Sequence, residues 1–129
     1  MVAINCSVEA VAKGQLILQI MCFENYYNLA HRHDDTLIEQ LAQDGIAYVP
    51  FFPLGGFTPL QSTILQQEAE TLQVSPLQVA LAWLLQRSPN ILLIPGTSSL
   101  VHLQENLAAA QLVLPEESIN NLNRIASEA

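Results

Sequence analysis

Short apolar runs alternate with longer amphipathic segments along the chain, and this pattern predicts strands separated by helices. Because the short runs are apolar almost throughout, they predict strands of a parallel sheet with crossover helices. We therefore expect one α/β domain, residues 1–129, built on four parallel strands. The predicted strands are Val2–Asn5, Leu16–Phe23, Ile46–Pro50 and Ile91–Ile94.

Residues that favour helix starts, and glycines that favour helix ends, lie between the apolar runs. The four resulting strand–helix units make up about half of the ~250 residues of an eight-stranded (β/α)8 barrel. We therefore expect a partial (half) TIM barrel, truncated at the N-terminus, with one apolar sheet face left bare. The predicted helices are Val8–Lys13 after Ser7 and before Gly14, Thr36–Gln43 after Asp34 or Asp35 and before Gly45, Pro59 to about Leu72, Pro76–Arg87 after Ser75, a helix through Ala110 after Ser98 or Ser99, and Pro115–Ile125.

The composition argues against some classes of binding partner. Only 12% of the residues are charged, and 50% are hydrophobic, whereas an average domain carries about 25% charged residues. The net charge is −8 with four bases, too few to neutralise a row of phosphates, so we expect no nucleic-acid partner. No run approaches the ~20 apolar residues of a membrane span. Cys6 and Cys22 read as free thiols of a cytoplasmic protein.

Two glycine-containing loops follow the third and fourth predicted strands. They are Pro53-Leu54-Gly55-Gly56 and Pro95-Gly96-Thr97-Ser98-Ser99. The second loop opens a helix whose free N–H groups would stabilise an anion, and in parallel barrels phosphate often binds the last two loops. Ordinary turn and cap chemistry explains the same residues. From the loops alone, both a phosphate site and plain loops remain open.

Several segments together resemble the aldo-keto reductase family, and the resemblance covers essentially the whole chain. It implies the C-terminal half, strands 5 to 8, of an NADP-dependent (β/α)8 barrel oxidoreductase acting on aldehydes or ketones. The segments that carry it are Ala3–Asn5, Asn25–Leu29, Ile46–Leu54, Ser75–Leu85, Ile94–Ser99 and His102–Leu107.

The resemblance implies a cofactor role for particular positions. Asn5 would contact the nicotinamide carboxamide, and Phe51 would stack on the nicotinamide ring. Residues Phe52, Leu54 and Gly56 would line the pyrophosphate loop. The residues that would meet the adenosine ribose, its 2′-phosphate and the adenine are Gly96, Thr97, Ser98, Glu105 and Asn106.

Three positions depart from the family pattern. Ile4 replaces a usual Ser, and Glu24 replaces a usual Gln that can both donate and accept. His102 stands where many members place an Arg on the 2′-phosphate. A neutral His is a weaker phosphate partner than a bidentate guanidinium, so the preference for NADP over NAD is open.

The catalytic Asp, Tyr, Lys and His of the resembled family come from the first half of its barrel, and we identify no catalytic residue here. We expect the chain to be inactive alone and to pair with a first-half polypeptide or with a second copy of itself. The alternative is a non-catalytic remnant that binds a nucleotide or a partner, and an inert fragment is a third possibility.

The run His31-Arg32-His33-Asp34-Asp35 carries two histidines and two carboxylates that could bind a divalent metal. A solvated loop with a helix cap explains the same residues without a metal. We favour the loop and expect no metal site.

Overall fold

The computed structural model describes residues 1–55 and 62–128, and it contains a parallel three-stranded sheet in the order β1-β2-β3. The strands are β1 (Val2–Ile4), β2 (Cys22–Tyr26) and β3 (Ala47–Phe51). Val2 lies opposite Cys22, which in turn lies opposite Ala47. The prediction of a parallel α/β sheet is confirmed.

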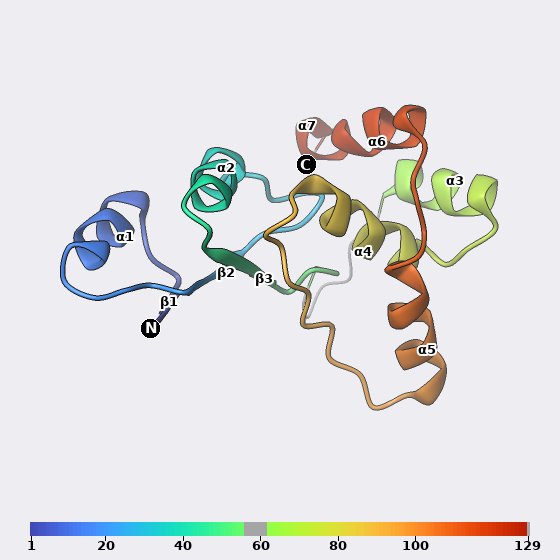
Figure 1. Cartoon of the computed structure of the whole chain (residues 1–129). Coiled ribbons are helices and arrows are strands. Elements are labelled where there is room, and N and C mark those ends of the chain that lie inside the picture. Colours follow the sequence, from blue (N-terminus) through green and yellow to red (C-terminus); the bar gives the residue numbers. More distant parts are fainter. Residues whose placement is uncertain (56–61, 129) are drawn as a thin grey trace.

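The two faces of the sheet differ in how far other parts of the chain bury their side chains. Phe23 and Tyr48, register partners in β2 and β3, have no exposed surface. On the opposite face, Val2 and Ile4 of the edge strand β1 are 50% and 58% exposed. Figure 1 shows α2 and α4 on one side of the sheet, with β1 at its free edge near the N-terminus. The second face is therefore bare at the edge strand β1, whereas Val49 of β3, on that same face, is buried.

Most of the helices begin at the residues that favour helix starts. Ser7, Ser75 and Ser99 each accept a hydrogen bond from a backbone N–H of the first turn, as predicted. Figure 1 places α5 apart from the sheet, against α4. The helices are α1 (Val8–Gln15), α2 (Asp35–Gln43), α3 (Thr63–Leu72), α4 (Pro76–Arg87), α5 (Leu100–Ala109), α6 (Glu116–Asn123) and α7 (Ile125–Glu128).

The prediction of a strand over Leu16–Phe23 is wrong for most of its length. The amides of Ile17 and Leu18 bond to the Gly14 carbonyl in a turn that follows α1. Leu16 is 88% exposed. Strand pairing explains the boundary, because β1 offers partners to β2 only from Cys22 onward. An apolar run without a neighbouring strand stays a loop.

The predicted fourth strand, Ile91–Ile94, is reduced to one bridge in the described part of the chain. Tyr48 pairs there with Ile91, through bonds to the Asn90 carbonyl and the Leu92 amide. Beyond that point the chain leaves β3, and Leu92 and Ile94 are each 55% exposed. The prediction of four parallel strands is therefore corrected to three.

Other predicted helix features also change. The helix predicted from Thr36 begins at Asp35, and the predicted Asp cap is wrong, because the Asp34 side chain makes no cap hydrogen bond and binds Asn25 and Tyr48 instead. Gly14 lies inside α1, which continues to Gln15. Ser62, whose backbone is extended, caps α3, so that helix begins at Thr63 instead of Pro59, a residue outside the described ranges. The last predicted helix is divided at Arg124 into α6 and α7. Within the described residues, no helix has the length and apolarity that crossing a membrane would need.

Candidate functional site

Backbone strain marks the carboxyl end of the sheet. Asn5 directly follows β1 and Phe52 directly follows β3, and both adopt left-handed backbone with φ near 52°. This conformation costs a non-glycine residue of order 1–3 kcal/mol and occurs most often at functional sites. The described residues hold a third such position, Gln73, which is explained as the C-cap of α3. Strain thus points to the loops after β1 and β3.

A cavity of about 470 Å³ lies between two loops that are far apart in the sequence. One wall is the segment Phe51–Leu54, and the other is the segment Ile94–Gly96. A Cβ added at Gly96 would meet no atom within 4 Å, so the second wall stays open. The structure therefore brings together both glycine-containing loops that the sequence singles out.

A tight turn shapes the first wall. The Gly55 amide donates to the Phe52 carbonyl at 3.0 Å, closing the turn with Pro53 at its second position, where proline is favoured. The Asn28 side chain also donates to this carbonyl, at 3.3 Å. The left-handed Phe52 is therefore held from within its own loop and from the loop after β2.

Four rings gather beside this turn, and we call them the aromatic shelf: Tyr26, His31, Phe51 and Phe52. The Tyr26 ring is stacked on Phe51, with centroids 6.0 Å apart, and lies 4.5 Å from the His31 ring. Phe52 meets both Tyr26 and Phe51 edge to face. Its side chain is 44% exposed. The shelf offers ring surface next to the cavity.

The second wall continues into the first turn of α5. Ser99 accepts a hydrogen bond from the His102 amide, and the Thr97 hydroxyl accepts one from the Ser99 amide. Gly96, Thr97 and Ser98 are exposed. An exposed helix N-terminus has free N–H groups and a positive dipole end, which together favour an anion.

Asn5 and Glu24 lie on the sheet, away from the cavity walls. The Asn5 amide donates to the Glu24 carbonyl at 2.8 Å. Glu24 is the register partner of Ile4 on the open face. Burial raises the pKa of the Cys22 thiol, two residues earlier in β2, and the Glu24 carboxylate raises it further.

The predicted cofactor residues therefore divide into groups. Phe51, Phe52, Leu54 and Gly96 surround one cavity. Asn5 and Glu24 lie on the sheet, and Gly56 falls outside the described residues. The residues that follow Gly96 in the loop and in α5 are Thr97, Ser98, His102, Glu105 and Asn106, of which Glu105 and Asn106 are half-buried.

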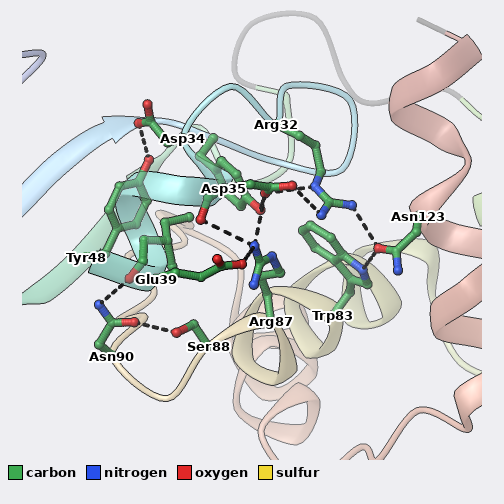
Figure 2. A network of polar contacts seen from close by, with 12 residues as sticks. Arg32, Asp34, Asp35, Glu39, Tyr48, Trp83, Arg87, Ser88, Asn90 and Asn123 are labelled. Atoms are coloured by element: carbon green, nitrogen blue, oxygen red, sulfur yellow. Dashed lines mark hydrogen bonds and ion pairs between the residues drawn. The ribbon is translucent and has the colours of Figure 1, made fainter. Parts of the chain in front are cut away.

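The carboxylates of the run His31–Asp35 bind protein groups. Asp34 accepts hydrogen bonds from the Asn25 amide and the Tyr48 hydroxyl. Asp35 accepts from Tyr27 and, through both oxygens, from Arg32. Figure 2 shows the contacts of Asp34 with Tyr48 and of Asp35 with Arg32. No group of three or more His, Cys, Asp or Glu side chains among the described residues is arranged to hold a metal ion.

The same network extends to α4 and α6. The Arg87 guanidinium contacts Glu39 at 3.0 Å and Asp35 at 3.5 Å. Arg32 donates to the Asn123 side chain, which also accepts from the Trp83 indole (Figure 2). These contacts tie α2, α4 and α6 together on the covered side of the sheet.

Two of the tyrosines are buried in this network. Burial and the hydrogen bond to Asp35 raise the pKa of Tyr27 to about 12. Burial and the hydrogen bond to Asp34 raise the pKa of Tyr48 well above its usual range. An efficient general acid has a pKa near the working pH, so neither hydroxyl is tuned for that role.

Sequence analysis missed Asn28 and the shelf residue Tyr26. Asn28 is fully buried, and its side-chain oxygen accepts from the Ala30 and His31 amides. An Asn side chain in a turn often binds its own backbone two residues on. That pattern, in the run Asn28-Leu29-Ala30, was the available signal.

Comparison with known proteins gives a consistent family match. The model of the family described as "Aldo/keto reductase family" matches residues 4–127. Pyridoxine 4-dehydrogenase of Escherichia coli (strain K12) is 60% identical over 124 residues, which are 96% of this chain and 43% of that protein. An uncharacterized oxidoreductase of Schizosaccharomyces pombe is 36% identical, covering 91% of this chain and 39% of that protein. The chain thus spans less than half the length of these curated relatives.

Solved structures agree on the fold. A thermostable aldo-keto reductase bound to the inhibitor epalrestat matches with a TM-score of 0.85 and 27% identity, over 95% of this chain and 46% of that one. The aldo/keto reductase of Klebsiella pneumoniae in complex with NADP and acetate matches with a TM-score of 0.83 and 24% identity, at the same coverages. The chain has the α/β fold of part of these barrels.

Proposed function

Because the chain belongs to the aldo/keto reductase family, we propose that its 129 residues form one domain, the NADP(H)-binding half of an aldo-keto reductase barrel. In this proposal β1, β2 and β3 correspond to barrel strands 5, 6 and 7, and the segment Ile91–Ile94 to strand 8. The observation that carries the proposal is the cavity between Phe51–Leu54 and Ile94–Gly96, which joins the loops after the last two strands.

The cavity and its surroundings fit a dinucleotide. Its walls are mainly apolar side chains beside the aromatic shelf, which suits a flat ring. The open space at Gly96 lets a phosphate approach the backbone. The N-terminus of α5, capped by Ser99, suits a negative charge. Apolar and anion-binding features therefore lie along one surface, as a nucleotide requires.

The adenosine end would bind along the second wall and α5. Gly96, Thr97 and Ser98 would contact the ribose and the 2′-phosphate, with His102 beside them in the first turn. The half-buried side chains of Glu105 and Asn106, one turn further along, would hold the adenine. The resemblance assigns these roles, and the exposure of Gly96, Thr97 and Ser98 supports them.

The nicotinamide end would lie over the sheet. Phe51 would stack on the ring, Phe52, Leu54 and Gly56 would follow the pyrophosphate, and Asn5 and Glu24 would face the carboxamide. NADPH, when bound, supplies a hydride to a carbonyl substrate. The left-handed backbone at Asn5 and Phe52 supports a binding role for both loops.

The chain's own residues would bind and orient the cofactor without donating a proton. Lys13, the only lysine, is exposed on α1. Tyr27 and Tyr48 hold carboxylates on the covered side of the sheet. We infer that the proton donor belongs to a first-half polypeptide, which would also cover the open face. A second copy of this chain is the other partner that could do so.

Calorimetry with NADP⁺, NAD⁺ and 2′,5′-ADP tests the binding half of this proposal. We expect NADP⁺ and 2′,5′-ADP to bind weakly, mainly through the adenosine end, with NADP⁺ the tighter of the two because its nicotinamide half also contacts the aromatic shelf. If neither compound binds, the proposal is overturned, and the chain is an inert or partner-binding remnant.

Turnover tests the other half of the proposal. Pyridoxal with NADPH is the substrate pair to use, because the 60% identical relative is a pyridoxine 4-dehydrogenase. We expect no turnover by these 129 residues, since general acid catalysis alone contributes about 10²–10⁴-fold. Turnover that is lost on Tyr26→Phe, Tyr27→Phe or Tyr48→Phe would contradict the absence of a proton donor.

A further inference from the structure

We propose that Asn28 is a positioning residue that sets the left-handed turn at Phe52 and thereby holds the aromatic shelf against the nicotinamide half of the bound nucleotide. The inference rests on the proposed function and adds to it a residue outside the cavity walls. Asn28 lies after β2, whereas Phe52 lies after β3. Its role is to couple two loops that the chain separates by 24 residues.

The hydrogen bonds of Asn28 determine the orientation of its amide. Its oxygen accepts from the Ala30 amide at 3.0 Å and from the His31 amide at 3.1 Å. Those backbone donors require an oxygen at that position, so the NH₂ group points to the Phe52 carbonyl. Because Asn28 is fully buried, water cannot replace a lost partner without cost.

Two donors meet at the Phe52 carbonyl, the Asn28 NH₂ group and the Gly55 amide. This carbonyl belongs to a strained residue with φ of 52°. Such strain persists only where surrounding contacts maintain it. Removing the Asn28 donor therefore favours relaxation of Phe52, and with it a shift of its ring and of the cavity wall.

The other side of Asn28 holds the remaining part of the shelf. Its oxygen lies 3.2 Å from Nδ1 of His31, and the His31 ring packs on Tyr26. The Tyr26 ring in turn is stacked on Phe51. One buried amide thus contacts the ring of His31 and the backbone of Phe52, two of the four shelf residues. The shelf therefore depends on a side chain that does not contribute a ring to it.

Asn28→Asp is the discriminating substitution, because it keeps the acceptor for the loop amides and places a second acceptor against the Phe52 carbonyl. Asn90→Asp is the matched control, since the Asn90 amide likewise donates to a backbone carbonyl, that of Ile46, while its oxygen accepts from Ser88. Asn28→Ser, which keeps an acceptor but is too short to span both loops, serves if Asn28→Asp does not fold.

We expect Asn28→Asp to weaken NADP⁺ binding about tenfold, the effect of one lost hydrogen bond and its strained neighbour, while 2′,5′-ADP binding changes less than about twofold. Hydrogen exchange of the Gly55 amide should accelerate in the same variant. Asn90→Asp should change neither the ratio of the two affinities nor the Gly55 exchange.

Equal weakening of both nucleotides by Asn28→Asp, or the same effect from Asn90→Asp, would overturn the positioning role. A wild-type chain that binds neither nucleotide overturns the proposed function instead. In that case unchanged Gly55 exchange in Asn28→Asp overturns the coupling of the two loops, and accelerated exchange supports it.

Discussion

Asp35 shows how a single side chain can link the stability of this chain to pH. Burial by itself raises the pKa of Asp35, but hydrogen bonds from Arg32 and Tyr27 outweigh it and hold the pKa below its ordinary value of 3.8. A carboxyl group with a lowered pKa stabilises the folded state above its unfolded pKa, and this stability is lost as the pH falls toward the folded pKa.

We therefore expect the free energy of unfolding to decrease as the pH is lowered from about 5 through the ordinary value of 3.8 and below it. Asp35→Asn should lower stability at neutral pH, because Arg32 and Arg87 lose a partner, and should flatten this acid dependence. Glu39→Gln is the control, since the Glu39 side chain is 61% exposed and such pairs contribute little. Urea unfolding across this pH range measures the effect. If the free energy of unfolding of Asp35→Asn falls with pH as steeply as that of the wild type, Asp35 does not cause the acid dependence.

His102 determines, in our proposal, how strongly the 2′-phosphate is bound. His102→Arg should tighten NADP⁺ several-fold and leave NAD⁺ nearly unchanged, because a guanidinium can donate two hydrogen bonds to a phosphate. Gln104→Arg adds the same charge to α5 on a different helix face. In calorimetry, Gln104→Arg should not raise the affinity for NADP⁺ more than that for NAD⁺. An equal rise in affinity for both nucleotides in His102→Arg would exclude a contact between His102 and the 2′-phosphate.

At the residue level, the sequence predicts what depends on local chemistry. The caps at Ser7, Ser75 and Ser99 are confirmed because a hydroxyl before a helix binds the first-turn amides whatever the tertiary context. The partnership of Asn28 with Phe52 could not be predicted, because it depends on how two loops meet across the sheet edge.

Among the described helices, α4 has the most buried residues, six, and a full capping box at its start. Ser75 and Gln78 form a capping box, each side chain bonding to the other residue's backbone. We expect Ser75→Ala to lower the free energy of unfolding by about 1 kcal/mol. Ser127→Ala, at an exposed position in α7, should change it by less than about 0.5 kcal/mol. Equal effects in thermal or urea unfolding would contradict the capping argument.

Strand boundaries were harder to predict than helix starts, and the reason is physical. Leu16, Ile17 and Leu18 have strand-like composition but no neighbouring strand to bond with, so they form a turn and stay exposed. Similarly, the segment Leu92–Ile94 keeps one bridge to β3 at its start. Strand pairing depends on the whole sheet, so an apolar run alone does not predict it.

At the scale of the whole molecule, the chain has two exposed apolar surfaces, the bare sheet face expected from the sequence and one face of α5. Val2 and Ile4 on the open face are at least half exposed. On α5, Leu100, Leu103 and Leu107 recur at helical spacing and are 78%, 45% and 66% exposed. Figure 1 places these two surfaces at different ends of the molecule. A partner that covers both would have to curve around the sheet, as barrel closure requires.

The purified chain should associate with itself. Exposed apolar patches above a few hundred Å² mark interfaces or aggregation, and a free strand edge such as β1 can pair with another chain. Light scattering should therefore detect dimers or larger species, and an apolar dye should bind. Ile4→Lys should reduce both signals, because it places a charge on the open face, whereas Gln15→Lys, at an exposed position on α1, should not. A monomer that melts cooperatively and binds no dye would refute the half-barrel interpretation.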